Sequence, residues 1–196
     1  IDAETPRIPN AALTDAAFSL LCATGDDGPI SDLFRVLGPT LAEAFGPNMA
    51  TLGVTKRDKI DPRSGLAIYN EITSWAAAFG LREIDVYVGG KEPTGIAGIG
   101  PAPAIVIGPE VNVPLSLLAR ARLGRELLGI VRGTTVTTWR DDSTISAIVV
   151  ASCALAKIPV KSPPNAALAE VERLLGKAMS RKVRNAIEPI CMTLVK

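Results

Sequence analysis

The hydrophobic period of the chain changes abruptly at Glu83, and this change sets the class of fold. Up to that point, apolar residues recur three and four positions apart, which is the spacing of one face of a helix. Over residues 84–88, apolar and polar residues alternate instead, as in a half-buried strand. Glycine and proline then separate residues 95–100 and 104–108 as two further short strands. The pattern therefore predicts a helical part followed by a small sheet.

Helical spacing on both sides of the sheet predicts the remaining elements. The second helix is expected to be capped by Ser31 and to bend or split at Gly38-Pro39. After the sheet, a long helix is expected to begin at Pro114 and to end at Gly133. Residues 134–138 are β-branched, and we expect them either to form a fourth strand or to connect two helices. Three more helices are predicted, and their expected caps or first residues are Asp142 or Ser143, Ala166 and Ser180.

The predicted fold is an α/β (α+β) domain over residues 11–196, preceded by a proline-containing linker over residues 1–10. A helical layer over residues 11–80 is expected to pack on a small mixed sheet of three or four strands over residues 83–108. Residues 114–196 are expected to form a central helix and a C-terminal helical bundle. With 196 residues and 47% hydrophobic composition, the chain is able to bury a substantial core. Because it does not begin with Met, we expect a piece of a longer protein.

The charge balance argues against polyanionic partners. The chain has 21 basic and 20 acidic residues, and a net charge of +1 gives no general attraction to nucleic acid or to an anionic membrane. Apolar runs stay shorter than the about 18 residues that a membrane span needs, so no span is predicted. A local basic face is predicted near the C-terminus, and we interpret it as a solvated helix end rather than a binding patch: Lys177, Arg181, Lys182 and Arg184.

The absence of histidine limits the chemistry that is open to the chain. It excludes Ser-His-Asp and Cys-His hydrolases and removes the commonest zinc ligand. Cys22, Cys153 and Cys191 form an odd set without CxxC spacing, which indicates reduced, buried thiols and a cytoplasmic location. The glycine-rich residues 95–100 lack the lysine and hydroxyl of a phosphate-binding loop, so nucleotide binding is not favoured.

A zinc-peptidase signature, HExxH, is broken in the central helix. Residues 123–129 read LGRELLG, so that Arg125 and Gly129 stand where two metal-binding histidines would be needed. Around this helix the chain resembles catalytically inactive gluzincin-like domains, found at the C-terminal end of larger proteins of myxobacteria and related bacteria. The resemblance extends over residues 63–196 and implies a zincin-like topology. Three passages carry it, namely residues 84–88, 104–110 and 117–129.

The resemblance implies that the metal site and the reaction are lost. The position of the base is kept as Glu126, but Arg125 is a permanent cation and Gly129 has no side chain. No glutamate between Ile130 and Ala169 supplies a third ligand. No metal, no cofactor and no catalytic residue are therefore expected. What the resemblance retains is a strand edge that aligns extended peptide in active relatives, and here its possible peptide-binding residues are Ile84, Val86 and Val88.

Two interpretations of Glu126 stay open, a structural one and a catalytic one. Glu126 is expected to pair with a nearby arginine, namely Arg122, Arg125 or Arg132, in preference to a retained catalytic role. Other side chains are assigned to structure: Asp141-Asp142 to a helix cap rather than a Mg²⁺ site, and Tyr69, Trp75 and Phe79 to core packing rather than a partner groove.

The preferred function is a non-catalytic structural or protein-interaction domain. Its expected partners are other domains of the parent protein or a separate protein, bound as extended peptide on a strand edge or as a helix in an apolar groove. The alternative is an enzyme or small-ligand-binding domain that uses a cysteine or carboxylate site without metal.

Overall fold

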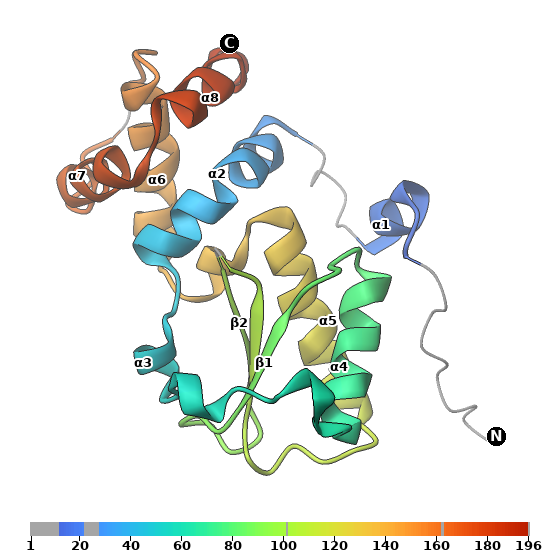
Figure 1. Ribbon diagram of the computed structural model, residues 1–196. Helices are drawn as coiled ribbons and strands as arrows, with labels where there is room; N and C mark the ends of the chain where they lie inside the picture. The colour runs from blue at the N-terminus through green and yellow to red at the C-terminus, as the bar shows by residue number, and fades with distance from the viewer. Residues whose placement is uncertain (1–11, 22–27, 101, 162, 196) are drawn as a thin grey trace. The chain divides into compact units, whose positions relative to one another are not determined.

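The computed structural model of the protein describes residues 12–21, 28–100, 102–161 and 163–195, and it has the predicted mixed α/β fold with a three-stranded sheet (Figure 1). The chain forms two compact units. Of the described residues, unit 1 comprises 12–21, Met49–Gly98 and Pro103–Val131, and unit 2 comprises 28–48, 99–100, 102, 132–161 and 163–195. Each unit has its own hydrophobic core. The single domain predicted over residues 11–196 stays a prediction, and the predicted linker falls outside the described residues.

Unit 1 contains the sheet and the helix with the broken peptidase signature. The strands lie in the order β1-β3-β2, and β1 pairs with β3 in parallel from Asp85↔Ala104 to Val88↔Ile107. The N–H of Gly108, the residue after β3, donates to the carbonyl of Gly95, the residue before β2, at 2.8 Å. The elements of this part are α1 Asp15–Leu21, α3 Met49–Leu52, the 3₁₀ turns Lys56–Asp58 and Pro62–Ser64, α4 Ala67–Ala78, β1 Asp85–Val88, β2 Ile96–Ile99, β3 Ala104–Ile107 and α5 Leu117–Arg132.

Apolar residues of α4, α5 and all three strands form the core of unit 1. Its fully buried members include Ile72, Ile105 and Leu123. Phe79 belongs to this core and Trp75 packs against it, which confirms the prediction that these aromatic side chains serve packing. The four residues of β3 are all buried, and β1 buries Val86 and Tyr87 in succession, so the predicted half-buried alternation is wrong for β1. Parallel strands covered on both faces have this continuous burial.

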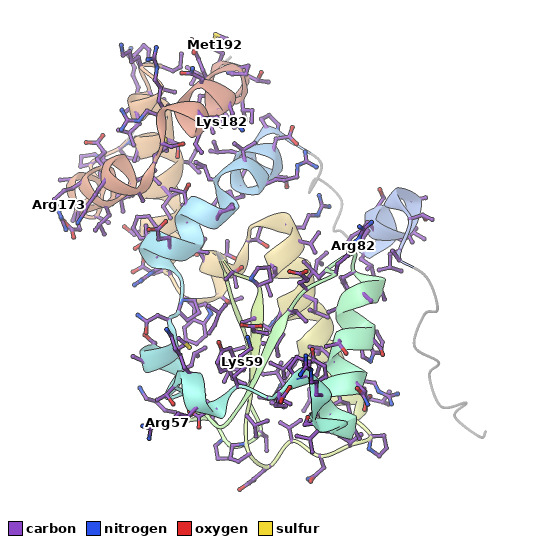
Figure 2. All side chains as sticks on the ribbon, in the orientation of Figure 1. Arg57, Lys59, Arg82, Arg173, Lys182 and Met192 are labelled. Atoms are coloured by element: carbon purple, nitrogen blue, oxygen red, sulfur yellow. The ribbon has the colours of Figure 1, made fainter. Side chains whose placement is uncertain are left out.

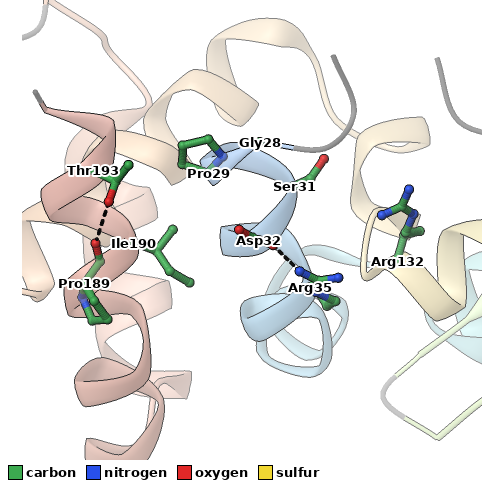
Figure 3. Close-up of a pocket in the computed structure, with 9 residues that line it drawn as sticks. All are labelled: Gly28, Pro29, Ser31, Asp32, Arg35, Arg132, Pro189, Ile190 and Thr193. Atoms are coloured by element: carbon green, nitrogen blue, oxygen red, sulfur yellow. Dashed lines mark hydrogen bonds and ion pairs between the residues drawn. The ribbon is translucent and has the colours of Figure 1, made fainter. Parts of the chain in front are cut away.

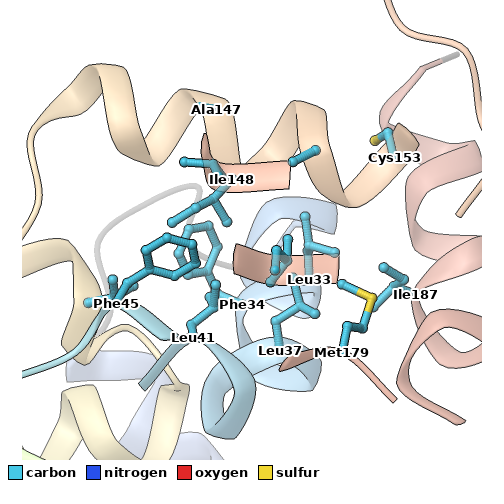
Figure 4. Close-up of a cluster of buried hydrophobic side chains, with 14 of the residues drawn as sticks. Leu33, Phe34, Leu37, Leu41, Phe45, Ala147, Ile148, Cys153, Met179 and Ile187 are labelled. Atoms are coloured by element: carbon cyan, nitrogen blue, oxygen red, sulfur yellow. The ribbon is translucent and has the colours of Figure 1, made fainter. Parts of the chain in front are cut away.

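Unit 2 is helical, and its core lies between four helices (Figure 4). The elements are α2 Pro29–Phe45, the 3₁₀ helix Thr135–Thr138, α6 Asp142–Leu155, α7 Leu168–Ala178 and α8 Arg181–Leu194. Leu37 and Leu41 of α2, Ile148 of α6 and Ile187 of α8 are fully buried in this core. The predicted helical bundle at the C-terminal end therefore includes α2, which the sequence places before the sheet.

Two predictions for α2 are wrong, namely the cap at Ser31 and a split at Gly38-Pro39, and of the two alternatives for residues 134–138 the connection between helices is confirmed. The helix α2 begins at Pro29 with Gly28 as its N-cap, so Ser31 lies inside it, and it continues through Pro39 without a break. Residues 135–138 form a 3₁₀ helix and add no fourth strand. Local propensity favours a break or a strand at these places, but burial of the flanking apolar residues overrides it.

Helix caps follow the predicted residue types more closely than the predicted positions. Asp141, rather than Asp142 or Ser143, caps α6 by accepting the N–H of Thr144 at 2.7 Å, and Ser180 caps α8 as predicted. The helix α5 begins at Leu117 and leaves Pro114 outside, so the prediction that Pro114 opens this helix is wrong. Among the described residues, no helix has both the length and the apolar composition that crossing a bilayer requires.

Candidate functional site

The three positions of the broken signature lie on α5 in unit 1. Glu126 is buried, with 4% of its side chain exposed, whereas the side chain of Arg125 is 63% exposed. Leu123 and Leu127 on the same helix are fully buried in the core of unit 1, and they turn Glu126 toward the sheet. Gly129 lies one turn further on and offers no side chain. The helix therefore places one carboxylate, and no second donor from these positions, under the strands.

Both oxygen atoms of the Glu126 carboxylate have partners. Oε2 accepts the backbone N–H of Gly98 in β2 at 3.0 Å. Oε1 accepts from Nη2 of Arg125 at 2.8 Å and from its Nε at 3.2 Å. A Cβ atom at position 98 would lie 3.3 Å from Oε2 and 3.3 Å from Cδ1 of Ile130, so the glycine allows helix and strand to approach this closely. The predicted pairing of Glu126 with an arginine is confirmed for Arg125.

A second side chain of α5, one helical turn earlier, binds the turn that precedes β2. Nη1 of Arg122 donates to the carbonyl of Thr94 at 3.1 Å. Because the carbonyl of Gly95 faces β3, Gly98 faces the opposite, outer edge of β2, and Thr94 lies in the turn that precedes this strand. Arg122 and Glu126 are four residues apart and share one face of the helix. We call the set Arg122, Glu126, Thr94 and Gly98 the β2 clasp, since two side chains of α5 satisfy one backbone group of β2 and one of the turn that precedes it.

The donor set of the clasp does not suit a divalent metal ion. A guanidinium group lies 2.8 Å from the only carboxylate, and a permanent cation there repels a second positive charge. Throughout the part of the chain that the structure describes, no three Cys, Asp or Glu side chains gather in a group able to hold a metal. The fold of unit 1 thus presents Glu126 as a hydrogen-bond acceptor for the protein itself.

The strand edge predicted to bind peptide is partly paired within the chain. Ile84 precedes β1, Val86 is fully buried, and the carbonyl of Val86 accepts the N–H of Ile60 at 2.8 Å. Lys59, which is labelled in Figure 2, forms an antiparallel bridge with Tyr87, and its ammonium group contacts Asp85 at 2.8 Å. The hydrogen bond to Asp85 raises the pKa of Lys59. Peptide binding by Ile84, Val86 and Val88 stays a prediction, and this pairing closes the centre of β1 to it.

Unit 1 contains a buried ion pair that the sequence did not predict. Glu71 of α4 is 9% exposed and accepts the N–H of Leu115 at 3.1 Å. Nη2 of Arg120, on a side chain that is 12% exposed, lies 3.4 Å from Oε1 of Glu71, and its Nε has no hydrogen-bond partner. The pair joins α4 to the start of α5. Its only signal in the sequence is a glutamate beside the apolar stripe of a helix, which equally fits a solvent-exposed position.

A cavity of about 580 Å³ lies beside the first turn of α2 in unit 2 (Figure 3). Several of its polar groups are paired: Asp32 pairs with Arg35, and the hydroxyl of Thr193 donates to the carbonyl of Pro189 at 3.1 Å. The lining therefore carries both an acidic and basic side chains, and its Asp32 is already paired. The predicted basic face lies elsewhere in unit 2, at the end of α7 and the start of α8, where Lys177, Arg181 and Lys182 are exposed.

Two of the three cysteines lie in the core of unit 2, which confirms their predicted burial. Cys153 is 1% exposed and Cys191 is fully buried. Burial and a hydrogen bond with Cys153 raise the pKa of the Cys191 thiol to about 12. A thiol that stays protonated at neutral pH is a poor nucleophile, so this environment does not favour the alternative of a cysteine enzyme. Cys22 lies outside the described residues.

Comparison of the chain with protein-family models, with curated proteins and with solved structures gives no significant match in any of the three. The gluzincin-like resemblance therefore rests on the three passages that carry it in the sequence, and the geometry of unit 1 has to be interpreted from its own contacts.

Proposed function

We propose that the chain is a non-catalytic, peptidase-like domain that serves as a structural or protein-interaction module of a larger bacterial protein. The observation that carries this proposal is the use of Glu126. A general base needs a lone pair directed at a water molecule and room for a substrate. Here one oxygen accepts the amide of Gly98, the other accepts the guanidinium of Arg125, and the side chain is 4% exposed.

An exposed apolar segment supports the interaction part of the proposal. Val113, Leu117 and Leu118 are 41%, 72% and 62% exposed, and they lie around the start of α5 in unit 1. Leu118 also lines a cleft of about 330 Å³ whose walls include Thr94 and Arg122. Large apolar side chains that gather on one short segment are typical of protein contacts, whereas single exposed ones are ordinary. We call Val113, Leu117 and Leu118 the 113–118 surface and propose it as the contact region.

Hydrolysis assays test the first half of the proposal. The wild-type chain and Glu126→Gln are incubated with a quenched-fluorescent peptide mixture, with and without added Zn²⁺. We expect the same background signal from both proteins. Zinc-dependent cleavage that disappears in Glu126→Gln would overturn the non-catalytic assignment.

Binding assays test the second half. Leu117→Ser/Leu118→Ser is compared with Leu66→Ser, which changes another exposed leucine of unit 1 (48% exposed). Quantitative mass spectrometry of cross-linked complexes from the source bacterium should show a partner that the double variant loses and that Leu66→Ser retains. Equal recovery of every protein by the two variants would count against the 113–118 surface.

A further inference from the structure

Basic side chains gather in unit 2 where α6 and α7 end and α8 begins. Gly176 connects the three helices: a Cβ atom on it would lie 3.5 Å from Cδ2 of Leu155 in α6, and its carbonyl accepts from Nη2 of Arg184 in α8 at 3.0 Å. The predicted basic face lies around these contacts, and the structure adds Lys157, two residues after Leu155. We call this set the basic end of unit 2: Lys157, Lys177, Arg181, Lys182 and Arg184. All but the half-buried Arg184 are exposed, and Figure 2 labels Lys182.

Lys157 has a backbone conformation that glycine normally supplies. It follows the C-cap of α6, and its φ of +63° lies in the left-handed region. The N–H of Lys157 donates to the carbonyl of Ala154 at 2.9 Å, and the N–H of Ile158 donates to that of Cys153 at 2.9 Å, which is the bonding pattern of a Schellman motif. Glycine is the usual residue at this position, because a Cβ atom is strained there. The cation at position 157 therefore lowers the stability of unit 2 relative to glycine.

The start of α8 is also unfavourable for cations. The N-terminal end of a helix carries a partial positive charge, which favours acidic residues in the first turn and disfavours basic ones. The first four residues of α8 include no acidic residue, but they include Arg181, Lys182 and Arg184. Ser180 already caps the helix by accepting the N–H of Val183 at 3.3 Å, so the cations are not needed to begin it.

No ion pair within the described ranges compensates the charges of the basic end, whereas Arg173 on α7 pairs with Glu170 at 2.6 Å. Like charges on one exposed surface repel one another, and a bound anionic group offsets this repulsion. Side chains that are held at a cost in stability are typical of functional sites. The structure thus favours a binding surface over the solvated helix end that the sequence favours.

We propose that the basic end of unit 2 binds an acidic segment of a protein partner, rich in aspartate and glutamate. A short segment fits because exposed carboxylates border the surface, Glu170 on α7 and Glu188 on α8. A long polyanion, such as RNA or an anionic membrane, would lie against these carboxylates as well. Residues 154–161 and 176–188 also contain no aromatic side chain on which a base could stack. This surface does not depend on the 113–118 surface of unit 1, so either proposal is able to fail alone.

The experiment measures by fluorescence anisotropy how the full chain binds a labelled peptide of alternating glutamate and serine residues. The same peptide with glutamine in place of glutamate is the neutral probe. Lys177→Gln/Lys182→Gln removes two charges from the basic end. Its matched control, Lys56→Gln/Arg57→Gln, removes two exposed charges from unit 1 and has the same net charge. Lys157→Gly removes one charge and relaxes the left-handed conformation, and thermal unfolding of each protein is followed by circular dichroism.

We expect the acidic peptide to bind the wild type and Lys56→Gln/Arg57→Gln equally, and to bind Lys177→Gln/Lys182→Gln roughly threefold to tenfold more weakly. Lys157→Gly should bind the peptide more weakly and unfold at a higher Tm, a combination that loss of folding does not produce. The neutral peptide should not bind.

The proposal is overturned if the wild type does not bind the acidic peptide, if the two double variants bind it equally, or if Lys157→Gly keeps the affinity of the wild type. It is equally overturned if polyuridylate RNA or phosphatidylserine vesicles bind the wild type more tightly than the acidic peptide does, because the occupant would then be of another class.

Discussion

Replacing Glu126 by glutamine and by alanine separates a structural carboxylate from a catalytic one. A catalytic carboxylate often lowers the stability of the folded protein, so its removal commonly leaves the free energy of unfolding unchanged or raises it. The carboxylate described above instead satisfies the amide of Gly98, so its removal should lower the free energy of unfolding of unit 1. Glutamine keeps an oxygen that is able to accept this N–H, whereas alanine does not.

The magnitudes follow from the two partners of the side chain. In Glu126→Ala the buried N–H of Gly98 loses its acceptor, at a cost of about 2 kcal/mol. The guanidinium of Arg125 returns to water at little cost, because that side chain is 63% exposed. In Glu126→Gln only the pairing with Arg125 is lost, which should cost less than about 1 kcal/mol. We therefore expect glutamine to be the milder substitution by roughly 1–2 kcal/mol.

Urea unfolding with tryptophan fluorescence measures this difference in unit 1 alone. The two tryptophans of the chain lie in different units, Trp75 in unit 1 and Trp139 in unit 2. In a Trp139→Phe background, the emission of Trp75 reports the unfolding of unit 1. Equal losses in the two Glu126 variants, or a gain of stability in either, would refute the role of Glu126 as acceptor for the edge of β2.

Three further measurements test the structure elsewhere. Glu71→Ala should lower the stability of unit 1 by about 3–5 kcal/mol in urea unfolding, because it leaves the N–H of Leu115 and the guanidinium of Arg120 without their buried acceptor. A loss of less than about 0.5 kcal/mol, as at an ordinary surface site, would contradict this role. The hydrogen bond from the backbone N–H of Thr144 lowers the pKa of Asp141 below its ordinary 3.8. The ionised Asp141 carboxylate therefore stabilises unit 2 fully well above that pH, and this stabilisation is lost as the pH falls through the lowered pKa. In a pH series that brackets 3.8, Asp141→Ala should therefore differ from the wild type only on the high-pH side, and a constant difference would be inconsistent with the cap. Gly133→Ala should destabilise unit 2 by more than about 1 kcal/mol, since the residue has φ +71° and an added Cβ would meet backbone atoms of a neighbouring helix. An unchanged Tm would contradict that packing.

The sequence predicts the strands of this protein better than it predicts the ends and bends of its helices. The strands β2 and β3 lie within the predicted ranges because glycine and proline end the runs on both sides. For α2 the same reasoning predicts a split at Gly38-Pro39, which is wrong because Pro39 stands inside the helix. Leu37 and Leu41 on either side of this proline are fully buried, and their burial offsets the backbone hydrogen bond that the proline lacks.

The candidate site is predictable to the level of residue types and no further. That a glutamate on the central helix pairs with an arginine follows from the helix alone, because Arg125 is its neighbour in the sequence. The amide of Gly98 is 28 residues away, and nothing local indicates that β2 and α5 approach so closely. Long-range contacts of this kind depend on the register and packing of the whole sheet, which a hydrophobic period does not specify. The same limit explains why the buried pair of Glu71 and Arg120 was missed.

The contacts at the two outer edges of the sheet restrict how a partner is able to bind unit 1. An unpaired strand edge is a template for adding another strand, and proteins commonly block it. Here the segment Lys59–Ile60 pairs with the centre of β1, and the β2 clasp occupies the carbonyl of Thr94 before β2 and the N–H of Gly98 within it. A peptide that added to either edge would have to displace one of these contacts. Recognition through side chains avoids this cost, and the 113–118 surface supplies them on the segment that leads into α5. A partner that binds through its own apolar side chains is therefore a better match to unit 1 than an extended peptide.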